Sequence, residues 1–278
     1  MNNSRDIKTQ KQNGFSIIEL LVAVVISMLL LTGVIQVFLA SKQTYTTNEA
    51  ASRLQENGRF ALEFIAQSAR HAGYVEPANT TASKPAPIAI PGAATCNTPQ
   101  VCSSNGAGNA SDAIGFTLQP RLLEGNVRRD CLGSVVGDAN NIDLIINQFV
   151  IIPAASAADH PALGCRSWNI NDNSWISGAS PASLIDGIDA LQIQYGLSSN
   201  SSDLNSANQY VSAERVTALN KWNDVAAIRI AVLANSVERT SPPTPARPYV
   251  LLDAAPIVID DGRARQVFTT TIKLRNTF

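Results

Sequence analysis

Hydrophobic residues are concentrated in one long run, Phe15 to Ala40, which follows a polar leader. The run has one ionisable side chain, Glu19, and contains neither proline nor a basic residue. A helix of this length, at about 1.5 Å per residue, is about 39 Å long and can cross a hydrocarbon core of about 30 Å. The run is too long for the apolar core of a cleaved secretory signal, which has about 7–15 residues. We therefore predict a membrane-spanning helix over residues 15–40.

After Ser41 the pattern changes, because apolar residues recur at spacings of three and four up to Ala72, as in a helix with one buried face. Gly73 follows as a candidate C-cap. The sequence predicts one spine helix over residues 15–72, half in lipid and half packed on a globular domain. We expect the helix to be weakest at Gly33 and Gly58. The predicted buried stripe consists of Ala51, Leu54, Gly58, Ala61, Ile65 and Ala69.

Six later segments have the composition and turn-rich borders of short β-strands. In the last of them, every second residue from Phe268 to Leu274 shares one face, opposite polar side chains. Turn-rich connections favour an antiparallel sheet, so a spine helix packed on it gives an α+β fold. We assign residues 73–278 to one globular domain with a loop-rich insertion at about 77–184. The six predicted strands are Ala113–Leu118, Ile142–Ile152, Ala190–Tyr195, Val225–Ala234, Ile257–Ile259 and Arg265–Arg275.

Composition adds two constraints. About 200 residues outside the membrane are enough to bury a hydrophobic core. The net charge is −1 and only 15% of the residues are charged, which gives no electrostatic footprint for nucleic acid as a direct partner.

The charges that flank the apolar run predict its orientation. Arg5, Lys8 and Lys11 precede it, with only Asp6 against them, so the N-terminus should stay in the cytoplasm. Everything after Ser41 then lies on the far side, which is the periplasm in a diderm bacterium.

All four cysteines, Cys96, Cys102, Cys131 and Cys165, lie beyond the predicted membrane span, where disulfides form and persist. Three pairings are possible. We favour Cys96–Cys102, which closes a tight loop, and Cys131–Cys165, which would stabilise the fold by about 3–4 kcal/mol in the chain-entropy model. A metal site is the weaker alternative, because neither a C-x-x-C motif nor a nearby histidine pair is present.

Catalytic motifs of the common nucleophile, nucleotide and zinc types do not occur in the sequence, so we expect neither an enzyme nor a cofactor site. The two histidines have simple structural interpretations, since we expect His71 at a helix end and His160 in a loop. The corner Asp260–Gly262 could bind calcium, but a turn before the last strand needs no ion.

Two further pairs of residues have both a functional and a simpler interpretation. Trp168 and Trp175 flank a polar turn, and we expect them to close a hairpin rather than to contact a carbohydrate or a surface. Arg128 and Arg129 form a lone basic pair, most simply in contact with solvent.

Glu19 is the anomaly of the membrane run. A carboxylate about one turn inside the membrane costs several kcal/mol unless it is paired or neutral. The alternative is that its side chain reaches the head groups. Gly14 precedes the run and leaves a small, flexible peptide bond that an aspartyl peptidase could cut. Cutting there would create an amine on Phe15, which could pair with Glu19 in a bundle of such helices.

These residues resemble a known signal. The segment GFSIIELLVAVVIS, residues 14–27, is similar to the class III signal of type IV prepilins. The resemblance implies that a prepilin peptidase cleaves between Gly14 and Phe15 and N-methylates Phe15. It also implies that Glu19 neutralises the N-terminal amine of a neighbouring subunit during assembly. Major pilins often carry a proline in the membrane half, where this chain has Gly33 and Gln36.

Three later segments, IDGIDALQIQYGL, WNDVAAIRIAVLANS and DDGRARQVFTTTIKLRN, resemble the globular part of the PilW group of minor pilins. Such a protein is a low-copy subunit that helps initiate the pilus, sits in its tip complex, and supports twitching motility, adhesion and DNA uptake. The implied partners are other minor pilins, the major pilin, the prepilin peptidase, the inner-membrane assembly machinery and membrane lipid. The implied location is the inner membrane and then the assembled pilus. A type II secretion pseudopilin and a signal-anchored periplasmic protein remain as alternatives.

Overall fold

A computed structural model of the chain describes residues 14–76, 85–90, 102–140, 143–156, 159–200 and 204–276. The basic leader residues, most of the proline-rich stretch after the spine helix, and Cys96 lie outside this described part. The chain divides into two compact units, Met1–Thr47 and Asn48–Phe278. They are described separately below.

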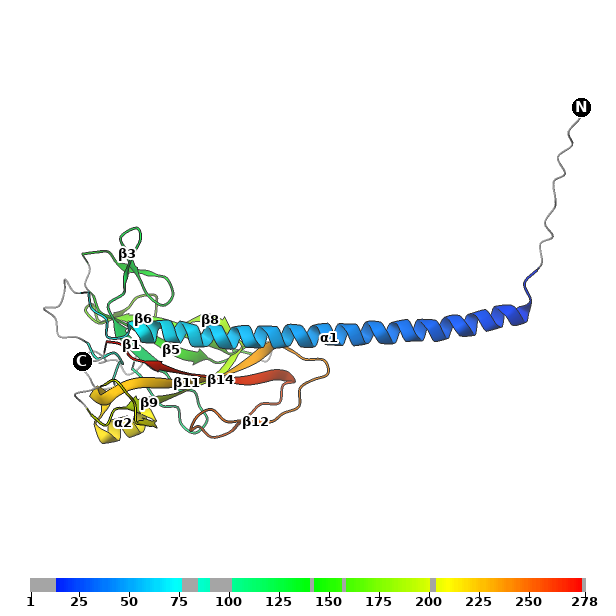
Figure 1. Ribbon diagram of the computed structural model, residues 1–278. Coiled ribbons are helices and arrows are strands. Elements are labelled where there is room, and N and C mark those ends of the chain that lie inside the picture. The colour runs from blue at the N-terminus through cyan, green and yellow to red at the C-terminus, as the bar shows by residue number, and fades with distance from the viewer. Residues whose placement is uncertain are drawn as a thin grey trace, which may run out of the picture. The chain divides into compact units, whose positions relative to one another are not determined.

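The predicted spine helix is present as α1, Ile17–His71, which is 55 residues long (Figure 1). It begins two residues after Phe15 and ends one residue before the predicted end. Gly73 follows with a φ of 73°, and its N–H donates to the carbonyl of Thr117 at 2.8 Å. The glycine therefore ends the helix as predicted, because it adopts the left-handed conformation at low cost.

The second half of α1 buries the predicted stripe, with one shift at its start. Ala51 is exposed, and Ala50 is buried in its place because the stripe advances by four residues to Leu54. Gly58 is a packing position: a Cβ atom there would lie 2.3 Å from the ring of Phe268. The buried residues of α1 are Ala50, Leu54, Gly58, Ala61, Ile65, Ala66 and Ala69.

The first sheet is antiparallel and five-stranded, in the order β1-β5-β6-β7, with β8 also paired to β6. It lies in the predicted loop-rich insertion, where the pattern indicated the strands now labelled β1 and β5 and a hairpin at Trp168 and Trp175. Most of β6 was not predicted, because seven of its eight residues are buried, which removes the alternation of a half-exposed strand. The bounds are β1 (Ile114–Leu118), β5 (Ile145–Ile152), β6 (Ala162–Asn169), β7 (Ser174–Trp175) and β8 (Ala182–Asp186).

The second sheet is antiparallel and four-stranded, in the order β10-β9-β11-β14. Its three long strands correspond to predicted segments. The predicted alternation in the last strand is confirmed, since Ile272 is buried while Thr271 and Lys273 on either side of it are exposed. The bounds are β9 (Ile188–Leu197), β10 (Gln209–Val211), β11 (Val225–Arg239) and β14 (Arg263–Lys273).

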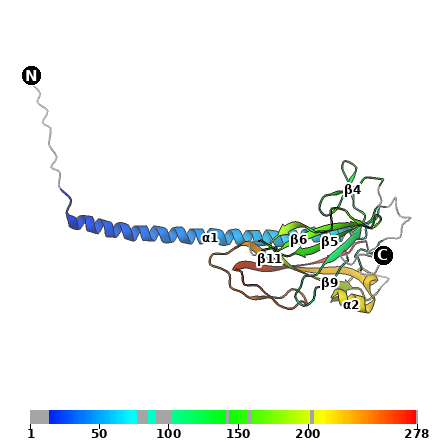
Figure 2. The ribbon, with the colours of Figure 1, turned by 180° about the vertical axis from the view of Figure 1, so that it is seen from behind.

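The remaining elements are short. A three-stranded sheet contains β2 (Leu122–Leu123), β3 (Val127–Arg129) and β4 (Val135–Gly137), and β12 (Pro248–Tyr249) pairs with β13 (Ile257–Val258). Helix α2 (Ala213–Leu219) begins after Ser212, whose hydroxyl accepts a hydrogen bond from the N–H of Arg215, and it is followed by the 3₁₀ turn η3 (Trp222–Asp224). Figure 2 shows α2 beside β9.

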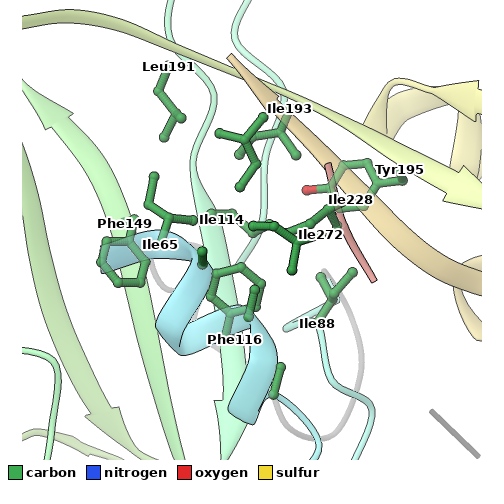
Figure 3. Close-up of a cluster of buried hydrophobic side chains, with 14 of the residues drawn as sticks. Ile65, Ile88, Ile114, Phe116, Phe149, Leu191, Ile193, Tyr195, Ile228 and Ile272 are labelled. Carbon is green, nitrogen blue, oxygen red and sulfur yellow. The ribbon is translucent and has the colours of Figure 1, made fainter. Parts of the chain in front are cut away.

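The core of the second unit lies where α1 and the two large sheets meet. Figure 3 shows Ile65 of α1 close to Phe116 and Phe149 of the first sheet, with Ile193 and Ile228 of the second sheet in the same cluster. The two phenylalanine rings pack edge to face, with centroids 6.2 Å apart. The predicted α+β arrangement, a spine helix packed on antiparallel sheet, is confirmed.

Candidate assembly interface

The N-terminal end of the described chain is accessible. Gly14, Phe15 and Ser16 precede α1, and Phe15 is 84% exposed. The helix begins where the carbonyl of Ser16 accepts hydrogen bonds from the N–H groups of Glu19 (3.1 Å) and Leu20 (3.2 Å). The peptide bond between Gly14 and Phe15 therefore lies in non-helical chain just outside the first helical turn.

The first part of α1 exposes apolar side chains on every face. All the large hydrophobic residues from Ile17 to Leu39 are exposed, and the most apolar window of the helix has no buried residue. This is the one helix among the described residues that is long and apolar enough to cross a membrane. Such a surface is unfavourable in water, so the segment is a membrane anchor.

Polar side chains in the first part of α1 differ in whether they have a hydrogen-bond or ion-pair partner. Ser27 and Thr32 donate their hydroxyl protons to helix carbonyls four residues earlier, at 2.7 and 2.8 Å. The carboxylate of Glu19 has no ion-pair partner in the described part of the chain. Glu19 lies in the first helical turn, where the positive end of the helix dipole stabilises an exposed carboxylate by about 0.3–1 kcal/mol. A full counter-charge has to come from elsewhere.

Arg128 contradicts the prediction of a solvated basic pair. Its side chain is 1% exposed, while Arg129 beside it is exposed. Its guanidinium donates to the carboxylate of Glu76, to the carbonyl of Pro120 and to the carbonyl of Asp138. A buried guanidinium needs several acceptors, and here they come from three separate segments. Arg128 therefore ties the chain leaving α1 to the β2–β4 sheet.

A second buried arginine joins three strands of the second sheet. Arg265 of β14 donates through Nε to Asp189 at 2.7 Å and through both Nη atoms to Asp261 at 2.6 Å. Burial raises the pKa of Asp189, against the opposing effect of Arg265. The hydrogen bonds from Arg265 lower the pKa of Asp261 to about 2. Asn235 of β11 completes the network by donating to Asp189 at 2.8 Å.

This network argues against the calcium alternative at Asp260–Gly262. Both carboxylate oxygens of Asp261 already accept hydrogen bonds from Arg265, so they do not form an open cation site. The described residues contain no group of three or more His, Cys, Asp or Glu side chains placed to hold a metal ion.

The tryptophan pair forms the expected hairpin contact. Trp168 of β6 lies directly opposite Trp175 of β7, and their rings pack edge to face with centroids 5.0 Å apart. The guanidinium carbon of Arg166 lies 4.6 Å from the centroid of the Trp175 ring. The aromatic pair is therefore a cross-strand packing contact.

One disulfide of the structure joins Cys131, after β3, to Cys165 on β6, with the two Cα atoms 6.4 Å apart. Cys102 is also disulfide-bonded, while Cys96 lies outside the described residues. The Cys131–Cys165 bond fastens the β2–β4 sheet to the first large sheet. A disulfide of this kind persists in an oxidising compartment.

Asp112 is a buried carboxyl group that the sequence did not single out. Its oxygens accept hydrogen bonds from the N–H groups of Gly106 and Ile193, both at 2.7 Å. Burial raises the pKa of Asp112 to about 6, although the two N–H donors favour the charged form. The carboxyl group holds the loop before β1 against β9.

Comparison with known proteins gives two family matches. The profile of the prokaryotic N-terminal methylation motif matches residues 9–35, which contain Gly14, Phe15 and Glu19. The profile of type IV pilus-assembly protein W matches residues 149–276, from the middle of β5 to the end of β14. No curated protein matches the chain.

Among solved structures, the chain is similar to a type IV-like pilin from Thermus thermophilus. The two are 13% identical, the alignment covers 81% of this chain and 97% of the other, and the TM-score is 0.44. The methylation motif lies at the exposed N-terminal end of α1, and the PilW match contains all four strands of the second sheet. Together the two family matches, over residues 9–35 and 149–276, support a type IV pilus minor pilin that is similar to the PilW family.

Proposed function

We propose that this minor pilin helps to initiate type IV pilus assembly and takes its place in the tip complex of the fibre. Through the fibre it supports twitching motility, adhesion and DNA uptake. The observation that carries the proposal is the apolar first part of α1, which has one carboxylate, Glu19, and no partner for it in the described chain. Such a helix lacks a counter-charge for its carboxylate when it is alone, and packing beside other helices of the same kind can supply one.

Processing at the N-terminus makes that packing possible. We infer that a prepilin peptidase cleaves between Gly14 and Phe15 and that Phe15 is then N-methylated. The methylation motif spans this bond, and both residues are exposed ahead of the first helical turn. Cleavage leaves a cationic amine on Phe15. The amine of a neighbouring subunit then pairs with Glu19, which removes the cost of a lone carboxylate in lipid.

We place the leader, residues 1–14, in the cytoplasm and residues 73–278 in the periplasm, with residues 15–40 of the 15–72 spine in the membrane. The basic leader supports this orientation. The Cys131–Cys165 disulfide supports an oxidising location for the globular domain. After assembly the same domain lies on the extracellular fibre.

The partners follow from this role. We infer contacts with other minor pilins, the major pilin, the prepilin peptidase and the inner-membrane assembly machinery, and a structural rather than a catalytic contribution. The two family matches support such partners and a structural contribution.

The test is mass spectrometry of pili sheared from cells that express the full chain. We expect peptides of this subunit in the fibre fraction and a methylated Phe15 as its first residue. Recovery of the subunit only in membranes, or in fibres with its leader intact, would contradict the proposal.

A Gly14→Val variant tests the processing step directly. The β-branched side chain is bulkier and restricts the bond that the peptidase has to reach, so we expect at least a tenfold loss of cleavage. The unprocessed chain is longer by the leader and is visible as a larger species on a gel. Gly33→Val, which lies within α1 and away from the cleavage site, serves as the control and should be processed normally.

A further inference from the structure

A groove runs between the last turns of α1 and the β2–β4 sheet, with a volume of about 370 Å³. Apolar side chains of α1 and the first large sheet, Phe64, Leu118 and Phe149, lie along it. Leu123 of β2 lines the opposite wall and is 45% exposed. This apolar lining is large enough for one or two side chains of another molecule, and it belongs entirely to the second unit.

One polar atom in this groove lacks a partner. Asp130 is 8% exposed and lines the groove, and its Oδ1 accepts hydrogen bonds from the N–H groups of Leu132 (2.9 Å) and Ser134 (2.8 Å). Its Oδ2 is also buried, but it accepts no hydrogen bond from the described part of the chain. An unsatisfied buried acceptor costs about 1–3 kcal/mol, and a donor from a bound molecule would recover that cost.

The wall formed by the β2–β4 sheet also carries positive charge. Arg121 and Arg129 are both exposed and line the groove. Arg129 is held in place by donating to the carbonyl of Gly133 at 2.6 Å. The two guanidinium groups favour an occupant with acidic side chains and disfavour a cationic group as the donor to Asp130.

The walls of the groove are fixed before anything binds. The buried guanidinium of Arg128 ties β3 to Glu76 and Pro120, and the disulfide ties Cys131 to Cys165. Binding to preorganised walls avoids the entropy cost of ordering a loop. Of the residues that line the groove, all but Phe149 lie outside residues 149–276, the segment that matches the PilW profile.

We propose that the groove docks an extended segment of a different pilin subunit, one that carries an apolar side chain next to an acidic one. The apolar side chain packs on Phe64 and Leu123, which are the exposed apolar residues of the lining, and the carboxylate pairs with Arg121 and Arg129. A main-chain N–H donates to Asp130 Oδ2 once that buried side chain turns toward the groove. This inference rests on the proposed function, and it names a contact between globular domains. A second copy of this chain is the competing occupant, and the crosslink distinguishes it from a different pilin.

The test uses the full chain in piliated cells, with Leu123→p-benzoylphenylalanine as a photocrosslinker at the edge of the groove. We expect a crosslink to another pilin, with the attachment point next to an acidic residue of that pilin. Adding Arg121→Glu should lower the crosslinked fraction about fivefold, because an attraction becomes a repulsion. Arg215→Glu, an exposed charge reversal on α2, is the matched control and should leave the fraction unchanged.

Folding of each variant is verified by its Cys131–Cys165 disulfide in a non-reducing digest, so that loss of the crosslink is not loss of the fold. A crosslink only to lipid or to a second copy, or equal losses with Arg121→Glu and Arg215→Glu, would overturn the inference. So would the absence of any crosslink while the subunit is present in sheared pili. Absence of the subunit from sheared pili would overturn the proposed function and this contact together.

Discussion

The two units of this minor pilin treat charge in apolar surroundings in opposite ways. In the first unit, the carboxylate of Glu19 has no ion pair within the described chain, although it lies in the most apolar segment of the protein. In the second unit, the buried guanidinium of Arg265 is bonded to both Asp189 and Asp261. Since a buried charge is stabilised by pairing, the Arg265 network satisfies its charges within the globular domain, whereas for Glu19 we propose that a neighbouring subunit supplies the counter-charge.

The largest expected effect comes from removing the unpaired charge. Glu19→Ala should leave membrane insertion intact, because the substitution makes the helix more apolar, but it should lower incorporation into fibres at least tenfold. The measurement is the amount of this subunit in sheared pili relative to membranes. Ser27→Ala, which removes a hydroxyl already bonded within the helix, is the control. Wild-type levels of the Glu19→Ala subunit in sheared pili would rule out the charge-pairing role.

Removing the paired charge should instead damage the fold. Arg265→Met leaves the buried carboxyl of Asp189 without its cationic partner, and we expect a loss of about 3–5 kcal/mol in the free energy of unfolding. Urea denaturation of the full chain in detergent measures it. Arg53→Met breaks the exposed pair with Glu49 on α1 and should cost less than about 0.5 kcal/mol. Similar losses for the two variants would mean that burial does not decide the value of these pairs.

The pH dependence of the second unit should show the raised pKa of Asp112. Because its folded pKa, about 6, is above the ordinary 3.8, the folded state holds this proton more tightly than the unfolded state. Its contribution to stability is full below about pH 3.8 and is lost as the pH rises through about 6, a decline on the order of 3 kcal/mol. Asp261, with its pKa lowered to about 2, acts in a different window and loses its contribution as the pH falls below 3.8.

The measurement for Asp112 is the urea midpoint of the detergent-solubilised chain between pH 4 and pH 7. Asp112→Asn keeps one carbonyl oxygen as an acceptor but cannot ionise, so its midpoint should fall less over this interval than that of the natural chain. Parallel curves for the two proteins would show that another group governs the pH dependence.

The smallest expected effect contrasts two glycines of α1. Gly58→Ala adds a methyl group 2.3 Å from the ring of Phe268, and we expect a loss of about 1–2 kcal/mol despite the better helix propensity of alanine. Gly33→Ala meets nothing within 4 Å and should be neutral or slightly stabilising. Urea midpoints measure the first and helix content in detergent the second. A stable Gly58→Ala variant would show that the Phe268 ring moves aside easily.

Local sequence patterns predicted much of the fold. The apolar run was enough to predict the anchor helix, and the resemblance of residues 14–27 to prepilin signals implied the processing site. The stripe on the second half of α1 and the alternation in β14 were predicted because each is half-buried, so that period and face agree. Gly73 was predicted as the end of the helix from its position alone.

Patterns failed where burial is complete. β6 is buried on both faces and contains Gly164, so it has neither alternation nor a strand-like composition throughout. Arg128 was expected in solvent because a pair of arginines usually is, yet its acceptors lie at Glu76, Pro120 and Asp138. A local pattern cannot predict that Arg128 pairs with Glu76, which is 52 residues away in the sequence.

The sequence by itself determined that this protein is anchored by a prepilin-type helix and carries a mixed helix and sheet domain. Those properties depend on the period of apolar residues and on short motifs, which are local. Only the tertiary structure decided which arginines are buried, which carboxyl groups they hold, and that a groove with an unsatisfied oxygen of Asp130 lies beside α1. Those properties arise because folding brings distant segments together, and the cost of burying a charge depends on what surrounds it in space.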